Sequence, residues 1–280
     1  MTSVANAEQF DAWNGDGGRR WVATADQRDR ILAPVADALL DAAALTPGER
    51  VLDVGCGCGV TTLTAAVQVG DRGSVTGIDL SAPMLAVARE RALSTRLGNV
   101  EFVQDDAQTR EFEPASVDLV LSRFGTMFFS EPAQAFGNIG AALTASGRLC
   151  IATWRPLAAN EWLAVPGAVL LGHTDLPPSA EGPGMFAQSD ASIVADVLGA
   201  AGFVGIDLES VDVTLTLGRT VDEALTYLAE TGPGRTILEG IPEGRPREAA
   251  LDEVRNVLSD HVVDAGVQLG GAIWLITAAR

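Results

Sequence analysis

The sequence predicts an α/β fold in which helices cover both faces of a mainly parallel sheet. Two observations carry this prediction: strand-like and helix-like stretches alternate regularly, and a glycine-rich turn joins the first strand to the helix after it. In such sheets, ligands bind at the carboxyl ends of the strands. A chain of 280 residues is long enough for one large domain with an additional subdomain.

Residues 8–45 precede the alternation and are predicted to be helical, because apolar residues recur there at helical spacing. Within them, Trp13 and Trp21 flank a polar, glycine-rich stretch that we predict to be a flexible loop. The two rings either close over a bound ligand or pack the N-terminal helices onto the body. The predicted strands that follow lie at residues 51–54, 74–79, 100–104, 117–122 and 147–154. The predicted helices between them lie at residues 60–69, 82–93 and 132–143.

After Trp154 the alternation stops, and residues 155–188 are rich in proline and glycine. We predict a lid or acceptor-binding insertion here, because the segment leaves the carboxyl edge of the sheet where a site would lie. Further helices are predicted at residues 189–201, 221–230 and 246–263, with a Gly/Pro-rich bend before the last, and further strands at 206–217 and 272–278. The expected organisation is therefore a cap at 1–45, a core at 46–155, and a region at 156–280 that holds the lid and the final strands. Residues 155–190 and 218–265 are assigned to the lid or acceptor region.

The composition excludes several functions. The formal net charge of −18, with no basic stripe to offset it, disfavours a nucleic-acid partner. The chain has no lysine, which excludes Schiff-base chemistry and a P-loop. It shows neither a secretory signal nor an apolar stretch of bilayer length, so we expect a cytoplasmic protein without a membrane partner. Cys56, Cys58 and Cys150 are expected to be packing residues, and no cluster has the spacing of metal ligands.

The glycine-rich turn lies within Val51-Leu52-Asp53-Val54-Gly55-Cys56-Gly57-Cys58-Gly59. A dinucleotide fingerprint needs G-x-G-x-x-G, but the third glycine here comes one residue early. What distinguishes the turn is an acid two residues before the first glycine, together with a second acid, Asp79, at the end of the next strand. An NAD-type oxidoreductase is therefore a weaker alternative.

These residues resemble the class I S-adenosylmethionine-dependent methyltransferases, in the small-molecule branch related to ubiquinone and menaquinone biosynthesis enzymes. The matching stretches, in order between residues 46 and 155, are 51–59, 75–85, 104–107, 117–124 and 143–149. Residues 145–147 depart from the family, since Ala-Ser-Gly stands where Pro-Gly-Gly is usual. The resemblance implies a Rossmann-like, doubly wound sheet of about seven strands, the last one antiparallel, with an N-terminal helical cap and a lid insertion.

The resemblance also implies S-adenosylmethionine as cofactor and assigns residues to its parts. The turn glycines admit the methionine moiety, Asp53 receives its ammonium group, and Asp79 accepts the ribose hydroxyls. The adenine ring lies between two apolar side chains with its edge read by an acid and a backbone amide, and two residues at the end of the fourth strand face the sulfonium. With Trp21, the predicted cofactor-binding residues are Trp21, Asp53, Gly55, Gly57, Gly59, Asp79, Leu80, Met84, Asp106, Ala107, Ser122 and Arg123.

The expected function is transfer of a methyl group by in-line displacement to an oxygen, nitrogen, carbon or sulfur atom of a small, partly apolar metabolite. The predicted acceptor-binding residues lie in the lid and are Trp162, His173, Met185 and Phe186. His173 is the candidate general base, although a surface or packing role is the better expectation for it. Further candidates for that base are His261, Tyr227 and Asp190. A cofactor-binding scaffold without acceptor chemistry is the non-enzymatic alternative.

Overall fold

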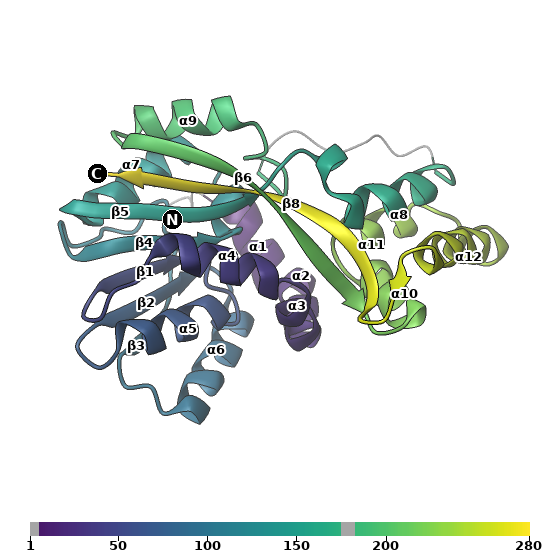
Figure 1. The fold of residues 1–280 in the computed structure, drawn as a ribbon, viewed down its shortest axis with the longest axis horizontal. Helices are drawn as coiled ribbons and strands as arrows, with labels where there is room; N and C mark the ends of the chain where they lie inside the picture. The colour runs from purple at the N-terminus through teal and green to yellow at the C-terminus, as the bar shows by residue number, and fades with distance from the viewer. Residues whose placement is uncertain (1–5, 175–182) are drawn as a thin grey trace.

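A central sheet organises the protein, as the computed structural model describes it for residues 6–174 and 183–280 (Figure 1). Its strand order is β3-β2-β1-β4-β5-β8-β6, with the short β7 paired to β8. The strands are β1 Arg50–Val54, β2 Ser74–Asp79, β3 Val100–Gln104, β4 Val117–Arg123, β5 Leu143–Trp154, β6 Val204–Gly218, β7 Val262–Val263 and β8 Gly266–Ala279. β8 runs antiparallel to β5 and β6, whereas β1 to β5 pair in parallel. The predicted sheet with an antiparallel last strand is confirmed, and the two-residue β7 is an addition to it.

Helices cover the sheet on both faces. The helices α4 Ala33–Ala43, α5 Val60–Val69 and α6 Ala82–Thr95 cover one face, and α7 Pro132–Ala142 and α9 Ala191–Ala200 cover the other. Successive strand residues therefore enter different cores: Val51 packs with α4 and α5, and Leu52 packs with α7. The strand and helix positions predicted between residues 51 and 142 agree with these elements to within two residues.

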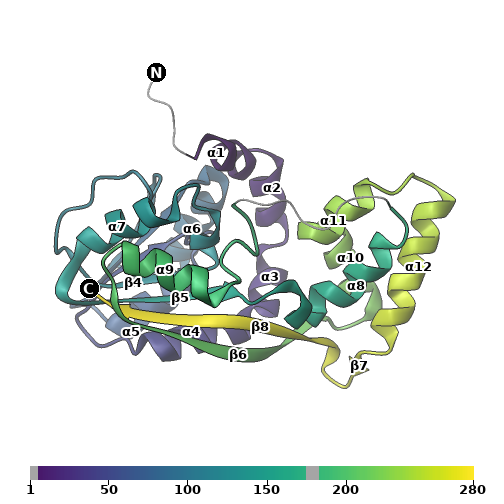
Figure 2. The same cartoon turned by 90° about the horizontal axis from the view of Figure 1, so that it is seen from above.

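The N-terminal helices α1 Ala7–Asn14, α2 Asp16–Ala23 and α3 Ala25–Ile31 lie beside the carboxyl ends of the strands (Figure 2). The predicted flexible loop between Trp13 and Trp21 is wrong, because only Gly15 separates α1 from α2. A Cβ on Gly18 would lie 1.9 Å from the Trp13 carbonyl oxygen, so glycine here permits close packing of successive helices. Glycine richness in this stretch reflects helix contact and not a lack of structure.

Beyond the sheet, β6 and β8 continue as a long antiparallel pair that carries an outer helical group (Figures 1 and 2). This group consists of α8 Glu161–Leu171, α10 Val221–Glu230, α11 Gly232–Glu239 and α12 Arg245–Ser259. The Pro/Gly-rich segment contains α8, for which no helix was predicted, and the predicted bend before residue 246 contains α11. In addition, the helix predicted to reach residue 263 ends at Ser259, and the last strand begins at Gly266. Residues 175–182 of the predicted lid lie outside the described residues.

Stacked aromatic rings join the outer helical group to the sheet. Phe124 stacks on Trp154 with ring centroids 4.3 Å apart, and Trp154 packs against Trp162 of α8 at 5.3 Å. Trp162 is buried, which explains why α8 forms despite Pro166 within it: the burial of its apolar side chains outweighs local propensity. Among the helices of the described residues, none is long and apolar enough to cross a membrane. Cys56, Cys58 and Cys150 are buried free thiols.

Candidate active site

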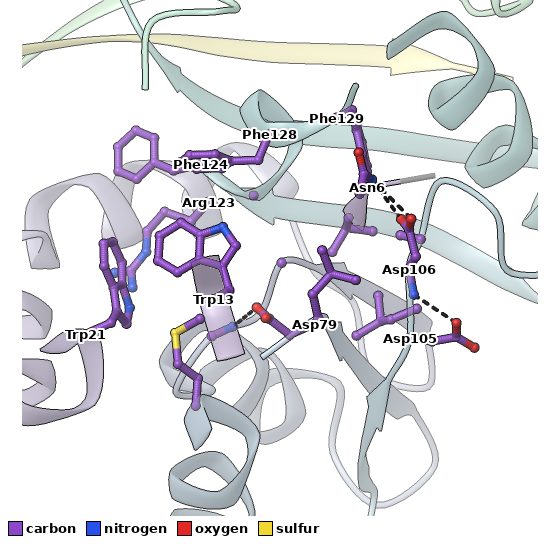
Figure 3. A pocket seen from close by; sticks show the side chains of 18 residues that line it. Asn6, Trp13, Trp21, Asp79, Asp105, Asp106, Arg123, Phe124, Phe128 and Phe129 are labelled. Atoms are coloured by element: carbon purple, nitrogen blue, oxygen red, sulfur yellow. Dashed lines mark hydrogen bonds between the residues drawn. The ribbon is translucent and has the colours of Figure 1, made fainter. Parts of the chain in front are cut away.

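A cavity opens at the carboxyl ends of β1, β2 and β4, beneath α1 and α2 (Figure 3). Of the residues predicted to bind the cofactor, those that line this cavity are Trp21, Gly55, Gly57, Asp79, Leu80, Met84, Asp106, Ala107 and Arg123. A second cavity adjoins the first and shares Trp21, Gly55, Gly57, Arg123 and Phe124 with it. The second cavity extends from the glycine turn toward α3 and the start of α5. The structure therefore brings most of the predicted cofactor-binding residues together at two adjoining cavities.

The glycine turn owes its composition to backbone conformation and to close contacts. Gly55 has φ +68°, and a Cβ on it would lie 2.5 Å from the Cα of Gly125. Gly57 has φ +55°, and its amide donates to the Asp79 carboxylate at 2.8 Å. Gly59 lines neither cavity. Its missing Cβ leaves room for Ala88 on α6. The predicted role of all three glycines is thus divided: Gly57 faces the cavity, and Gly59 serves packing.

Asp79 stands at the end of β2 with its carboxylate held by two backbone amides. Gly57 N donates to one oxygen at 2.8 Å, and Ser81 N donates to the other at 2.8 Å. Burial raises the pKa of Asp79 to about 6, and the two amide hydrogen bonds oppose that rise. The group is an ionised acceptor at neutral pH, with its remaining lone pairs facing the cavity.

Asp53 lies beneath the turn instead of in the cavity wall. One carboxylate oxygen accepts hydrogen bonds from Thr61 Oγ1 and Thr62 Oγ1, each at 2.7 Å. The other oxygen, Oδ1, is buried and has no hydrogen-bond partner. Burial raises the pKa of this carboxyl group, and the two threonine hydroxyls lower it. Asp53 Oδ1 can therefore still accept a hydrogen bond.

Ser122, by contrast, acts within the protein. Its hydroxyl donates to the Val54 carbonyl oxygen at 2.7 Å and accepts from the Gly125 amide at 3.2 Å. Ser122 lines neither cavity, and its side chain ties the end of β4 to the end of β1. It supports the Gly55–Gly125 contact below the site.

Asn6 contacts Asp106, the residue predicted to bind the adenine edge. Its amide nitrogen donates to both carboxylate oxygens of Asp106 at 3.1 Å, and its amide oxygen accepts from Ser130 N at 3.1 Å (Figure 3). Gln108 N donates to the same carboxylate at 2.9 Å. Sequence reasoning missed Asn6, since nothing near it in the chain signals a contact 100 residues away. A ligand amino group would have to share this carboxylate with Asn6 or displace it.

Aromatic rings form the other wall of the first cavity. Trp13 meets Trp21 edge-on at 5.4 Å and Phe128 edge-on at 5.3 Å (Figure 3). The Arg28 guanidinium lies 3.5 Å from the Trp21 ring centroid and donates to the Trp21 carbonyl oxygen at 2.7 Å. The rings pack the N-terminal helices and also line a cavity, so the packing interpretation holds, and closure over a ligand stays a prediction.

Arg123, the last residue of β4, lies where the two cavities meet. Its Nη2 is 3.4 Å from Asp29 Oδ1, and its Nη1 is buried without a hydrogen-bond partner. Asp29 also accepts from Arg91 at 2.8 Å through its other oxygen. Arg123 is therefore only weakly paired on one side and has a free donor on the other.

The predicted acceptor residues lie away from both cavities. His173, beyond the end of α8, is 3.0 Å from Glu253 of α12 through its Nε2. Trp162 is packed behind Trp154, while Met185 and Phe186 pack against the same core. The structure does not bring these four residues to the cavity, because α8 folds into the outer helical group instead of over the strand ends.

The further candidates for a general base are also remote or committed. Asp190 caps α9 by accepting from Ser192 N and Ile193 N, and His261 follows the end of α12. Tyr227 is buried next to Arg28, and burial raises the pKa of its phenol. Over residues 6–174 and 183–280, no three His, Cys, Asp or Glu side chains group as metal ligands.

Comparison with known proteins identifies the family. A family model described as a methyltransferase domain matches residues 45–177. Nocamycin O-methyltransferase of Saccharothrix syringae is 30% identical over 234 residues, which cover 80% of this chain and 83% of that protein. A SAM-dependent methyltransferase structure from Aquifex aeolicus superimposes with a TM-score of 0.52 at 15% identity, with 98% of each chain covered. The chain belongs to the class I S-adenosylmethionine-dependent methyltransferases, and S-adenosylmethionine is its cofactor.

Two shorter matches point to the same family. Aklanonic acid methyltransferase DauC of Streptomyces sp. strain C5 is 34% identical over 119 residues, covering 42% of this chain and 54% of that protein. The ubiquinone/menaquinone biosynthesis C-methyltransferase UbiE of Teredinibacter turnerae is 33% identical over 113 residues, covering 40% of this chain and 45% of the relative. These matches thus span about half of each relative's length. The predicted family, with its small-molecule branch, is confirmed, and the NAD-type alternative is set aside.

Proposed function

We propose that this methyltransferase acts on a small, partly apolar metabolite, which it methylates by in-line displacement at the junction of the two cavities. The observation that carries the proposal is the composition of that junction. Polar groups suited to a nucleoside, Asp79 and Asp106, lie on one side of it, and aromatic rings suited to an apolar acceptor lie on the other.

The residues present fit S-adenosylmethionine along the whole length of the site. Asp79, which has free lone pairs beside its two hydrogen bonds to backbone amides, would accept from the ribose hydroxyls. Leu80, Met84 and Ala107 would hold the adenine ring, and Asp106 would accept from its amino group. The unpartnered Asp53 Oδ1 would accept from the ammonium group of the methionine moiety. In this orientation, the sulfonium would lie near Trp21 and Arg123, which line both cavities.

The protein's contribution to the reaction is mainly positional. The cofactor supplies an electrophilic methyl group on a leaving group that is already activated, so orienting the acceptor in line supplies much of the acceleration. The Trp21 face attracts a cation, and the rings of Trp13 and Phe128 exclude water from the junction. Arg28 fixes Trp21 by stacking under its ring and binding its carbonyl oxygen.

The names of two relatives support a small organic acceptor. DauC is described as an aklanonic acid methyltransferase, and the relative that matches along most of this chain is described as a nocamycin O-methyltransferase. Acceptors of this kind would meet Trp13, Phe124 and Phe128 on the aromatic side of the junction. Neither the acceptor nor the atom methylated is fixed by these resemblances.

Titration calorimetry with S-adenosylhomocysteine tests the cofactor site. The wild-type protein should bind it. Asp79→Ala should weaken binding by about a hundredfold, because the two charge-assisted hydrogen bonds proposed from the ribose hydroxyls are lost. Asp71→Ala removes an exposed acid and should leave binding unchanged. Absence of binding by the wild type would contradict the proposed site.

Transfer itself is tested with labelled S-adenosylmethionine and a panel of acceptors. The panel contains aklanonic acid, demethylmenaquinone, and simple phenols, amines and thiols. Label should pass to at least one apolar member of the panel. Cofactor binding with transfer to none would favour the alternative of a binding scaffold without acceptor chemistry.

A further inference from the structure

We infer that the acceptor reaches this site as a preformed oxygen anion, a carboxylate or the conjugate base of an acidic enol or phenol, and that Arg123 holds the anion. The inference rests on the proposed function, because it uses the cofactor orientation given above. It narrows the methylated atom to oxygen and removes the need for a general base.

The first support is the incomplete pairing of Arg123. Its Nη1 is buried and has no partner, and its Nη2 reaches Asp29 only at 3.4 Å. An unsatisfied buried guanidinium donor is unfavourable, so a ligand that supplies an acceptor oxygen is favoured at this position. The planar guanidinium fork matches the two oxygens of a carboxylate or one oxyanion with a neighbouring carbonyl.

The second support is the charge of the junction. Arg28 and Arg123 line the second cavity together with one acid, Asp29, which Arg91 shares. Arg28 donates to the Trp21 carbonyl and the Thr24 hydroxyl and lies under the Trp21 ring. Of the described residues on this cavity, the only carboxylate that can offset its charge is therefore Asp29, which Arg91 and Arg123 share. A sulfonium next to Arg123 adds another positive charge in a partly enclosed space, where like charges repel strongly. An anionic acceptor neutralises this repulsion, whereas a neutral acceptor leaves it in place.

The third support is the lack of a free base among the described residues that line the cavities. Asp79 accepts from two amides, Asp105 pairs with Arg110, and Asp106 accepts from Asn6. The remaining lining acid, Asp29, lies between two arginines. Neither His173 nor His261 lines a cavity. An acceptor that still carried its proton would find no group placed to remove it.

The reaction then balances without any proton transfer. A lone pair on the acceptor oxygen forms the new O–CH₃ bond as the S–CH₃ bond breaks, and the electron pair of that bond remains on sulfur. The anion and the sulfonium both become neutral, giving a methyl ester or methyl ether and a thioether. The product can no longer pair with the Arg123 charge, so its affinity for the junction falls and its release is favoured.

The aromatic wall narrows the acceptor further. Phe124 and Gly125 follow Arg123 directly, and Phe128 and Trp13 lie on the same cavity. Flat apolar faces beside a guanidinium suit an aromatic acid better than an aliphatic one. A suitable probe pair is therefore 1-naphthoate and 1-naphthamide, which have nearly the same shape and differ in charge.

The first test compares cofactor forms and needs no acceptor. Wild-type protein should bind neutral S-adenosylhomocysteine more tightly than cationic S-adenosylmethionine, and Arg123→Met should reduce that ratio by about tenfold because one repelling charge is gone. Arg123→Lys should keep the ratio. Arg30→Met removes an exposed arginine of α3 that lines neither cavity and serves as the matched control. An unchanged ratio in Arg123→Met would overturn the inference.

The second test titrates the two probes into protein saturated with S-adenosylhomocysteine. Naphthoate should bind at least about tenfold more tightly than naphthamide in the wild type and in Arg30→Met, and the preference should vanish in Arg123→Met. Equal binding of the probes, or no naphthoate binding, would overturn the inference.

One outcome separates this inference from a role for Arg123 in cofactor binding. If Arg123 instead holds the cofactor's own carboxylate, Arg123→Met will weaken S-adenosylhomocysteine at least about tenfold and leave 5′-methylthioadenosine, which lacks the amino-acid group, unaffected. That result would overturn the inference and leave the proposed function standing. Failure of the wild type to bind S-adenosylhomocysteine would instead refute the proposed function.

Discussion

Acidification is expected to weaken cofactor binding through Asp79. Burial raises the pKa of this carboxyl group from 3.8 to about 6, so it loses its charge as the pH falls through that value. A protonated carboxyl group carries a donor where the Gly57 and Ser81 amides and the ribose hydroxyls all require acceptors. The affinity for S-adenosylhomocysteine should therefore be constant above pH 7 and fall below pH 6.

The size of the effect follows from the titration. One pH unit below the pKa, about one group in eleven is ionised, so at pH 5 the affinity should be roughly tenfold lower than at pH 7.5. Acidification should have the opposite effect on the stability of the unbound protein. Because the pKa of Asp79 is higher in the folded than in the unfolded state, the free energy of unfolding decreases as the pH rises from 3.8 to about 6. The decrease amounts to at most about 3 kcal/mol for a shift of this size.

Asp79→Asn should therefore bind poorly yet fold well. The substitution removes a buried charge, which stabilises the folded protein by about 1–3 kcal/mol. It also leaves one of the two backbone amide donors unpaired, which destabilises it by about 1–3 kcal/mol, so the free energy of unfolding should change little. Asp71→Asn is the exposed control. The assay is calorimetry between pH 5 and 8 with 5′-methylthioadenosine as second ligand. This ligand lacks the ammonium group that we propose to face Asp53, so it is insensitive to Asp53, whose pKa is also raised by burial. A flat wild-type profile, or the same slope in Asp79→Asn, would refute the reasoning.

Three further substitutions separate binding from stability. Asn6→Ala should tighten S-adenosylhomocysteine binding about threefold or more, because it frees the carboxylate oxygens at the adenine end; weaker binding by calorimetry would argue against competition. Trp154→Ala should lower the free energy of unfolding by about 3–5 kcal/mol in urea titrations, because the ring stacks on Phe124 within the core, and a loss below 1 kcal/mol would contradict that packing. Gly55→Ala should cost about 1–3 kcal/mol more than Gly48→Ala, since both have positive φ but only Gly55 has a backbone Cα where the Cβ would go; equal unfolding midpoints would disprove the contact.

The sheet and the part of the cavity lining at the strand ends and the glycine turn were predictable, because their signals are local. A strand that ends in an acid, or a turn that needs φ above zero, can be recognised from a few consecutive residues, as at Asp79 and Gly57. The boundaries predicted for β2, β3 and α5 match the structure for this reason. Where local and tertiary requirements differ, as in α8 with its internal Pro166, the Pro/Gly-rich sequence shows no helix signal, and burial produces a helix.

The rest of the cavity lining was not predictable, because its contacts join distant parts of the chain. Asn6 meets Asp106 across 100 residues, and Asp29 meets Arg123 across 94. Composition placed the acceptor residues in the segment after β5, whereas the rings on the cavity come from α1, α2 and the 3₁₀ turn Gly125–Phe128. No spacing rule relates those three elements, so only the fold brings them together.

The N-terminal helices connect the cavity to the outer helical group. Trp21 lies on the cavity, Arg28 holds Trp21 from below, and Tyr227 of the outer helical group lies beside Arg28. Gln27 of α3 also donates to the Leu217 carbonyl at the end of β6. A displacement of α10 would therefore move α3, and with it the aromatic ring proposed to face the sulfonium. The buried Arg28 guanidinium thus links Tyr227 of the outer helical group to the Trp21 ring on the cavity.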